Sequence, residues 1–116
     1  MIPANLDITI YRGDDFSLIF RMRDSVTNSY VDLTGRTARG QIRATPTSET
    51  IIASFTCTVL NQTTTPGGVL VTLSPALSAA LPLDGGVWDV EVANADRSWV
   101  RTPLAGAVTV LAEVTR

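Results

Sequence analysis

The feature that most constrains this chain is an alternation of apolar and other side chains with a period of two. In the stretch FSLIFRMR, the apolar residues Phe16, Leu18 and Phe20 occupy every second position, and Ile19 is the one misfit between them. Successive side chains of a strand point to opposite faces of a sheet, whereas a helix repeats about every 3.6 residues. The stretch therefore predicts a strand with one apolar face.

The same alternation recurs along the chain, between segments rich in turn-forming residues. Thr and Val are frequent, and both are β-branched residues that fit a pleated surface better than a helix. About seven strands at this spacing predict an all-β fold, a two-sheet, mainly antiparallel β-sandwich. The predicted core residues are Phe16, Phe20, Ile42, Phe55, Val71, Trp88, Val90 and Val110.

One segment departs from the strand pattern, the stretch SPALSAALP at 74–82. Ser74 can cap a helix, Pro75 suits its first position and Pro82 ends it. We expect one short helix at 75–81. Because so short a helix has little stability of its own, Leu77 and Leu81 are predicted to dock on the core.

Composition narrows the class of protein further. With 116 residues, 45% of them hydrophobic and 17% charged, the chain has the size and character of one ordered domain, which we expect to span 1–116. The net charge of -2 and the lack of a basic stripe disfavour nucleic-acid binding. The sequence has no apparent leader peptide and no membrane-spanning run, which predicts a soluble protein made in the cytosol.

The residue types also bear on catalysis. The sequence contains no histidine and no lysine, which removes the usual general base, the commonest zinc ligand and Schiff-base chemistry. Cys57 is the single cysteine and is expected to be a small core residue. The acidic pairs Asp14 with Asp15 and Asp84 with Asp89 lie beside turns or on solvent faces, without a metal-loop spacing. We therefore predict no enzyme, no cofactor and no metal site.

Residues Arg12 to Asp14 spell Arg-Gly-Asp, a tripeptide that some secreted proteins use to bind integrins. A turn explains it more simply, because Gly13 permits a positive φ and Asp14 can bond the backbone just beyond it. We expect Arg12 to Asp15 to be the connection of a hairpin between two strands. An adhesive role is not expected.

Four side chains are candidate contacts for a protein partner: Trp99, Arg101, Arg39 and Arg43. Trp99 follows a polar turn and is expected at a rim, where an aromatic ring with one wet edge can serve a protein or a sugar ligand. Arg39 and Arg43 lie on the non-core face of one strand and Asp89 on that of another. If the strands are neighbours, we expect Arg43 to pair with Asp89.

Several short patterns follow one another in a characteristic order. They are Gly13-Asp14 followed by Phe16, Asp32 to Gly35, Gln41 to Arg43, Trp88 to Val90, Gly106 to Val108, and Glu113 to Thr115. In this order the chain resembles, over nearly its whole length, a small immunoglobulin-like β-sandwich domain of tailed-bacteriophage baseplate and tail-fibre proteins.

The resemblance implies a structural component of a tailed-phage virion, made in the host cytoplasm, that assembles by contacts with other tail, baseplate or fibre proteins in many symmetric copies. The end segments, Met1 to Asn5 and Leu111 to Arg116, are then further candidate contacts. Two alternatives remain open: a capsid decoration (cement) protein of the same β class, and a carbohydrate-binding module that uses Trp99.

Overall fold

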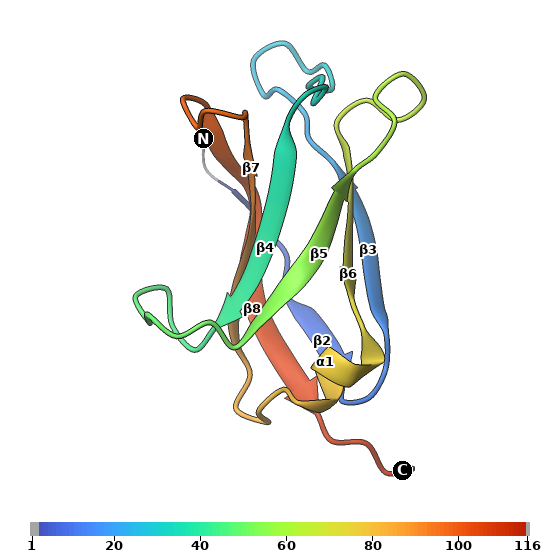
Figure 1. Ribbon diagram of the computed structural model, residues 1–116, viewed down its shortest axis with the longest axis vertical. Helices are drawn as coiled ribbons and strands as arrows, with labels where there is room; N and C mark the ends of the chain where they lie inside the picture. The colour runs from blue at the N-terminus through green and yellow to red at the C-terminus, as the bar shows by residue number, and fades with distance from the viewer. Residues whose placement is uncertain (1–2, 116) are drawn as a thin grey trace.

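The computed structural model describes residues 3–115, which form eight strands and one short helix (Figure 1). The strands are β1 (Ala4–Asn5), β2 (Ile8–Tyr11), β3 (Phe16–Arg21), β4 (Thr37–Arg43), β5 (Ala53–Val59), β6 (Gly68–Leu73), β7 (Gly86–Ala93) and β8 (Val100–Leu111). The helix is α1 (Pro75–Ala79), with Ser74 as its cap and Pro75 in its first turn. The fold is therefore all-β with one short helix, as the sequence predicts.

The strands pair along one continuous path, in the order β1-β8-β7-β4-β5-β6-β3, with β2 also paired to β8. β1 and β2 run parallel to β8, and the other pairs are antiparallel. β5 is shared by the two halves of the path. Its first part pairs with β4, where Phe55 lies opposite Gly40, and its second part pairs with β6, where Cys57 lies opposite Val71.

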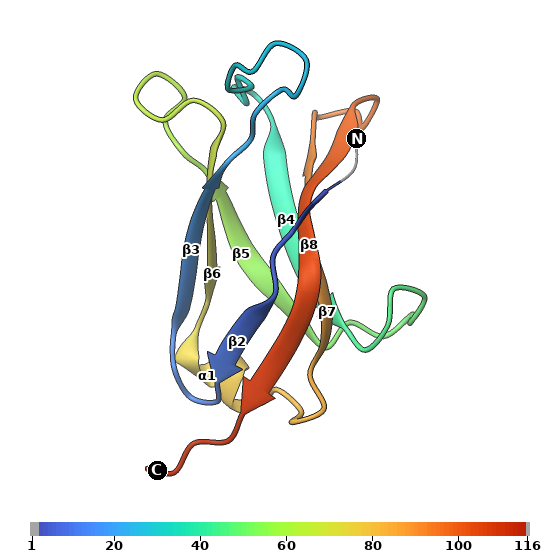
Figure 2. The same cartoon turned by 180° about the vertical axis from the view of Figure 1, so that it is seen from behind.

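This sharing makes the sheet curl around its apolar face. In Figure 1, β5 crosses diagonally between β4, β7 and β8 on one side and β3 and β6 on the other. Figure 2, seen from behind, shows β2 and β8 opposite β3 and β6. The apolar faces of the two halves therefore point toward each other and enclose the core.

The core contains most of the residues that the alternation predicts. Ile42, Phe55, Val71, Trp88, Val90 and Val110 are buried, whereas Phe16 and Phe20 are half-buried and pack against the others. The ring of Phe55 lies 5.8 Å from that of Phe16 and 5.6 Å from that of Trp88. Phe55 thus joins the two halves of the curled sheet, and burial of such rings is a large stabilising contribution.

Two details of the helix differ from the sequence prediction. The helix ends at Ala79, with Leu81 buried just beyond it, whereas Leu77 is 47% exposed and does not dock on the core. A helix of five residues can bury only one side, and that side carries Ser78.

Cys57 is half-buried and packs against the core, as predicted for a small core residue. Desolvation raises the pKa of its thiol to about 11.

The two ends of the long axis are built differently. We call the end formed by α1 and the segments 12–15 and 82–85 the helix end. The end formed by the loops 22–36, 60–67 and 94–99 is the loop end (Figures 1 and 2). At the loop end, β3 separates from β1 and β8 and leaves a gap of about 330 Å³, lined by apolar residues that include Phe20, Met22 and Leu104.

At the helix end, the segment 12–15 is a turn but not the predicted hairpin. Gly13 has a φ of 88°, as the turn requires, but β2 pairs with β8 and β3 pairs with β6. The turn instead crosses from one edge of the curled sheet to the other. Ser78 secures it, because its Oγ accepts a hydrogen bond from Gly13 N at 3.0 Å and donates to Asp14 O at 2.6 Å.

Candidate protein interaction surfaces

Trp99 and Arg101 lie together at the loop end, where the loop 94–99 leads into β8. The loop is ordered by Asn94, whose side-chain oxygen accepts from the backbone nitrogen of Trp99 at 2.9 Å. The half-buried Trp99 ring packs against the core, with the Arg36 guanidinium 3.6 Å and that of Arg101 5.0 Å from its centre. Trp99 is thus at a rim, as predicted, and it carries two stacked cations.

A second aromatic ring at the loop end has the same arrangement, and sequence reasoning missed it. The guanidinium of Arg21 lies 3.6 Å and that of Arg23 4.6 Å from the centre of the Tyr30 ring, and Arg23 also donates to the Tyr30 hydroxyl at 2.8 Å. The hydrogen bond from Arg23, followed by the charges of Arg21 and Arg23, lowers the pKa of Tyr30. Tyr30 lies in a loop without periodicity, so only its nearness in sequence to two arginines hinted at it.

Arg39 lies on the outer face of β4 and pairs with the carboxylate of Glu91. Its Nε is 3.0 Å from Glu91 Oε1, and Arg97 Nη2 approaches the same oxygen to 2.6 Å. β4 and β7 are neighbours, which meets the condition set in the sequence analysis, and Arg39 lies directly opposite Glu91 in the register. Partial burial works to raise the pKa of Glu91, but the two arginines outweigh it and the net shift is downward.

The predicted pair between Arg43 and Asp89 does not form. Among residues 3–115, ion pairs join Glu91 to Arg39 and to Arg97, and Arg43 instead donates to Ser48 O at 2.8 Å and to Gln41 Oε1 at 3.0 Å. The register explains this, because Asp89 lies opposite Gln41 rather than Arg43. Desolvation, with the charge of Glu91, raises the pKa of Asp89.

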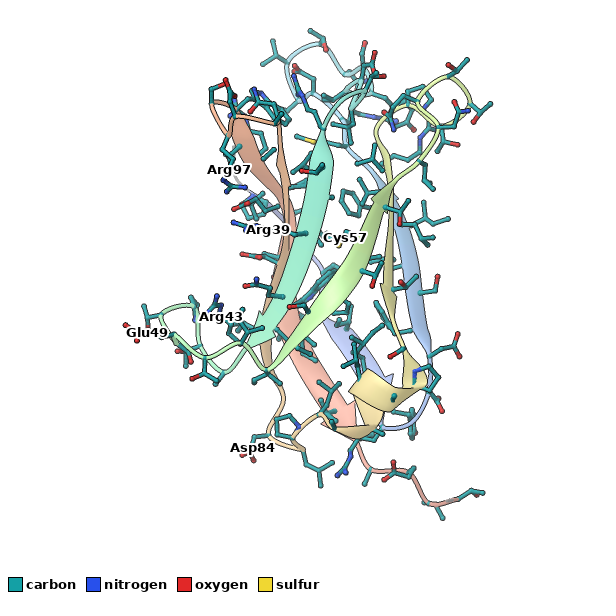
Figure 3. The ribbon with its side chains drawn as sticks, in the orientation of Figure 1. Arg39, Arg43, Glu49, Cys57, Asp84 and Arg97 are labelled. Carbon is teal, nitrogen blue, oxygen red and sulfur yellow. The ribbon has the colours of Figure 1, made fainter. Side chains whose placement is uncertain are left out.

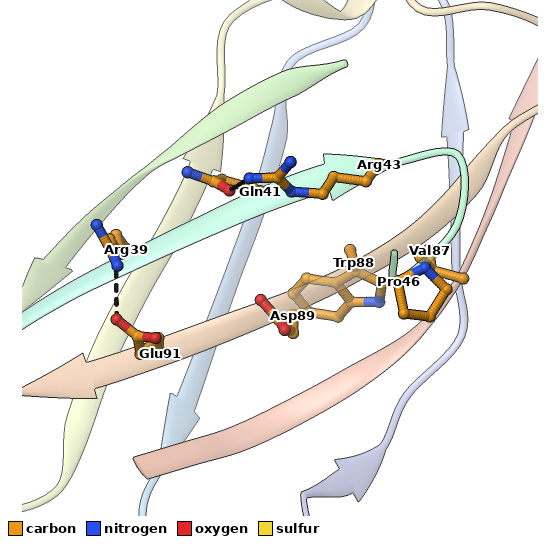
Figure 4. A pocket seen from close by; sticks show the side chains of 8 residues that line it. All are labelled: Arg39, Gln41, Arg43, Pro46, Val87, Trp88, Asp89 and Glu91. Carbon is orange, nitrogen blue, oxygen red and sulfur yellow. Dashed lines mark hydrogen bonds and ion pairs between the residues drawn. The ribbon is translucent and has the colours of Figure 1, made fainter. Parts of the chain in front are cut away.

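A groove on the outer face of β4 and β7 is lined by Arg39, Gln41, Arg43, Asp89 and Glu91 (Figure 4). The groove has a volume of about 310 Å³ and combines guanidinium, amide and carboxylate groups with Pro46 and the edge of Trp88. Arg39 and Arg43 therefore belong to one surface, whereas Trp99 and Arg101 belong to another at the loop end. The four candidate residues do not form one site.

The structure also bears on the predictions for Trp88 and for the two end segments. Trp88 is buried and its Nε1 donates to Leu6 O at 2.9 Å, as suits a core residue. The end segment Met1 to Asn5 is described only in part: Ala4–Asn5 forms β1, while Met1 and Ile2 lie outside the described residues, as does Arg116 at the other end.

Over the described range 3–115, no group of three or more histidine, cysteine, aspartate or glutamate side chains is placed to hold a metal ion. In the same range, no helix has the length and apolar character needed to cross a membrane. The groove on β4 and β7 and the loop end do carry charged and aromatic side chains suited to contacts with another macromolecule.

Comparison with known proteins adds no relative: no protein-family model matches the chain, and no curated protein matches it significantly.

Proposed function

We propose that this protein is a non-enzymatic structural component of a tailed-phage virion that acts in the tail, the baseplate or the attachment of fibres. Its partners are other virion proteins, which it contacts in multiple symmetric copies, and it is made in the host cytoplasm before assembly. The observation that carries the proposal is the ordered set of short patterns shared with phage baseplate and tail-fibre domains, taken with the all-β fold.

Two of those patterns have a structural reason in this fold. Gly13 sits at the crossing turn with a positive φ. Gly106 lies in β8 beneath the carbonyl of Leu6, and a Cβ at this glycine would overlap that oxygen. Both glycines of the patterns that carry the resemblance are therefore needed by the backbone of this fold.

We also infer that the curled sheet is an immunoglobulin-like sandwich. In this interpretation β1, β2, β8, β7 and β4 make one layer and β6 and β3 the other, with β5 passing from the first layer to the second. Strands that switch between layers at a bend occur in sandwiches whose layers are strongly inclined. Comparison of an experimental structure with phage sandwich domains tests this inference.

The surface chemistry suits an assembly protein. Four arginines stack on Tyr30 and Trp99 at the loop end, and arginine and aromatic residues are enriched where interfaces concentrate their binding energy. The same contacts disfavour the carbohydrate alternative, because a guanidinium 3.6 Å from the Trp99 ring centre occupies a face on which a sugar would stack.

Immunogold labelling of particles, with mass spectrometry of separated tails and heads, tests the proposal. The expected result is labelling of the tail or baseplate and recovery of the protein with tails. Recovery with heads would favour the capsid decoration alternative, and absence from purified particles would refute a virion role. Binding on a glycan array would favour the carbohydrate-binding module instead.

A further inference from the structure

The charged side chains are distributed unequally between the two ends of the molecule. Of the eight basic residues within the described range 3–115, six lie at or near the loop end. They are Arg21, Arg23, Arg36, Arg39, Arg97 and Arg101. Figure 3 shows the labelled Arg97 toward this end, Arg39 nearer the middle of the long axis, and Asp84 at the helix end. The molecule is 45 Å long, so the two ends are separated by several Debye lengths at physiological salt, each about 8 Å.

The loop end has fewer carboxylates than its six arginines: Asp24, Asp32, Asp96 and Glu91. The side chains of Asp24, Asp32 and Asp96 each accept a hydrogen bond from a backbone nitrogen of their own loop. Glu91 holds Arg39 and Arg97. Among the described residues, the four arginines that stack on Tyr30 and Trp99 form no close ion pair, although the charge of Arg36 acts on Asp32.

The gap at the loop end adds an apolar surface beside these cations. Met22 and Leu104 are buried beneath it, Phe20 is half-buried, and Arg21 and Arg23 stand at its rim. A partner that fits this end therefore carries exposed carboxylates next to exposed apolar side chains.

The helix end of the same chain has that composition. Asp14, Asp15 and Asp84 are exposed there and form no ion pair with the described residues. Leu77 and Leu83 are 47% and 53% exposed beside them. Arg12 is the one arginine of this turn, where it donates to Ala79 O, and the three acids outnumber it.

We propose that copies of this chain associate end to end, with the loop end of one copy bound to the helix end of the next. The inference rests on the proposed role as a virion assembly protein and names its partner as a second copy. Since the two surfaces are different, the contact is head-to-tail and leaves one end of each type free, so that it propagates into a ring or a filament.

The ends are wide enough for a specific contact. The shorter axes, 31 and 24 Å, give a cross-section of about 740 Å², close to the roughly 800 Å² that a standard interface buries on each partner. A contact steered by charge is sensitive to salt.

Sedimentation of the full chain and of two double variants tests the proposal. Arg23→Gln with Arg101→Gln weakens the loop end and leaves Arg21 and Arg36 on the rings, and Asp15→Asn with Asp84→Asn weakens the helix end. The native chain at ~100 µM and about 20 mM salt is expected to exceed the mass of a monomer and to return to it at about 1 M salt.

Each double variant alone is expected to associate at least about 10-fold more weakly than the native chain. An equimolar mixture is expected to form dimers and nothing larger, because each dimer uses the one intact end of each variant. Glu49→Gln, in the side loop between β4 and β5, is the control and should associate like the native chain.

A native chain that stays monomeric under all these conditions would overturn the proposal, as would a double variant that associates like the native chain. The two proposals fail separately. A protein found in virions but monomeric in solution refutes only end-to-end association, and one that associates end to end but is absent from virions refutes only the virion role.

Discussion

The two unpaired edges of the curled sheet are joined at the helix end but separated at the loop end. At the helix end the turn at 12–15 joins the edges, and the buried Ser78 fixes it with a hydrogen bond at 3.0 Å and another at 2.6 Å. At the loop end the edges separate around a gap, and exposed arginines stack on aromatic rings. The difference indicates that the helix end contributes more to stability than the loop end does.

The largest expected effect is on the core that both ends share. Phe55→Ala removes the ring that contacts Phe16 and Trp88, and should lower the free energy of unfolding by about 3 to 5 kcal/mol. Denaturant melts measure this value. A loss below about 1 kcal/mol would mean that the two halves of the sheet do not depend on one core.

The next effect concerns β8, where the N-terminal segment crosses closely. Gly106→Ala places a Cβ against the Leu6 carbonyl, which also accepts the hydrogen bond of Trp88 Nε1. Because backbone must shift, we expect a loss of about 2 to 3 kcal/mol by thermal or denaturant melts. Gly35→Ala, where a Cβ has open space but φ is 77°, is the control for backbone strain alone and should cost less.

A matched pair of substitutions compares the two ends directly. Ser78→Ala leaves the Gly13 N–H and Asp14 carbonyl without their partner and should cost about 1 to 2 kcal/mol. Asp32→Ala removes the loop-end acceptor for Thr34, which is exposed to water, and should cost less than about 1 kcal/mol. Equal losses in the two melts would contradict the proposed difference in stability.

The smallest effects are expected on β7, where neighbouring outward-facing carboxylates have opposite pKa shifts. Glu91 has a lowered pKa, so its stabilising effect is fully present above the unfolded pKa and is lost as pH falls below that value and through the lower folded pKa. Glu91→Gln should therefore cost up to about 1 kcal/mol at pH 7 and progressively less as the carboxylate of the native chain is protonated in acid.

Asp89 should behave in the opposite way. Because the pKa of Asp89 is raised, the folded state disfavours its ionised form. This destabilisation is present at pH 7 and disappears as pH falls through the raised folded pKa to the unfolded pKa. Asp89→Asn is expected to be neutral or slightly stabilising at pH 7, by less than about 1 kcal/mol. A loss of stability at pH 7 would contradict the assignment.

The local sequence pattern predicted most of the strands and core residues, but it predicted little of how the strands pair. Alternation located the strands and core residues such as Val71 and Val90, because a period of two is visible within a few residues. It did not predict that Ile8 pairs in parallel with Val108, since contacts so distant in sequence leave no local signal. The short turn at 12–15 suggested a hairpin for the same reason, because loop length alone does not reveal which edges a turn connects.

The candidate surfaces were predictable to a similar degree. Trp99 and Arg101 were found from composition and a preceding turn, and Arg39 from its alternation. The partner of Arg43 was not, because a shift of two residues in register decides which outward-facing residue lies opposite an arginine: Arg43 lies opposite Val87, whereas Arg39 lies opposite Glu91. Tyr30 was missed because an irregular loop carries no periodicity.

Amide hydrogen exchange at two matched positions tests the contrast between the ends most directly. Gly13 N–H donates to Ser78 Oγ at the helix end, and Val26 N–H donates to Asp24 Oδ1 at the loop end, at 3.0 and 2.8 Å. If the helix end is closed, Gly13 should exchange at least about 100-fold more slowly than Val26, after correction for intrinsic rates. Equal exchange at the two positions, or slower exchange at Val26, would contradict it.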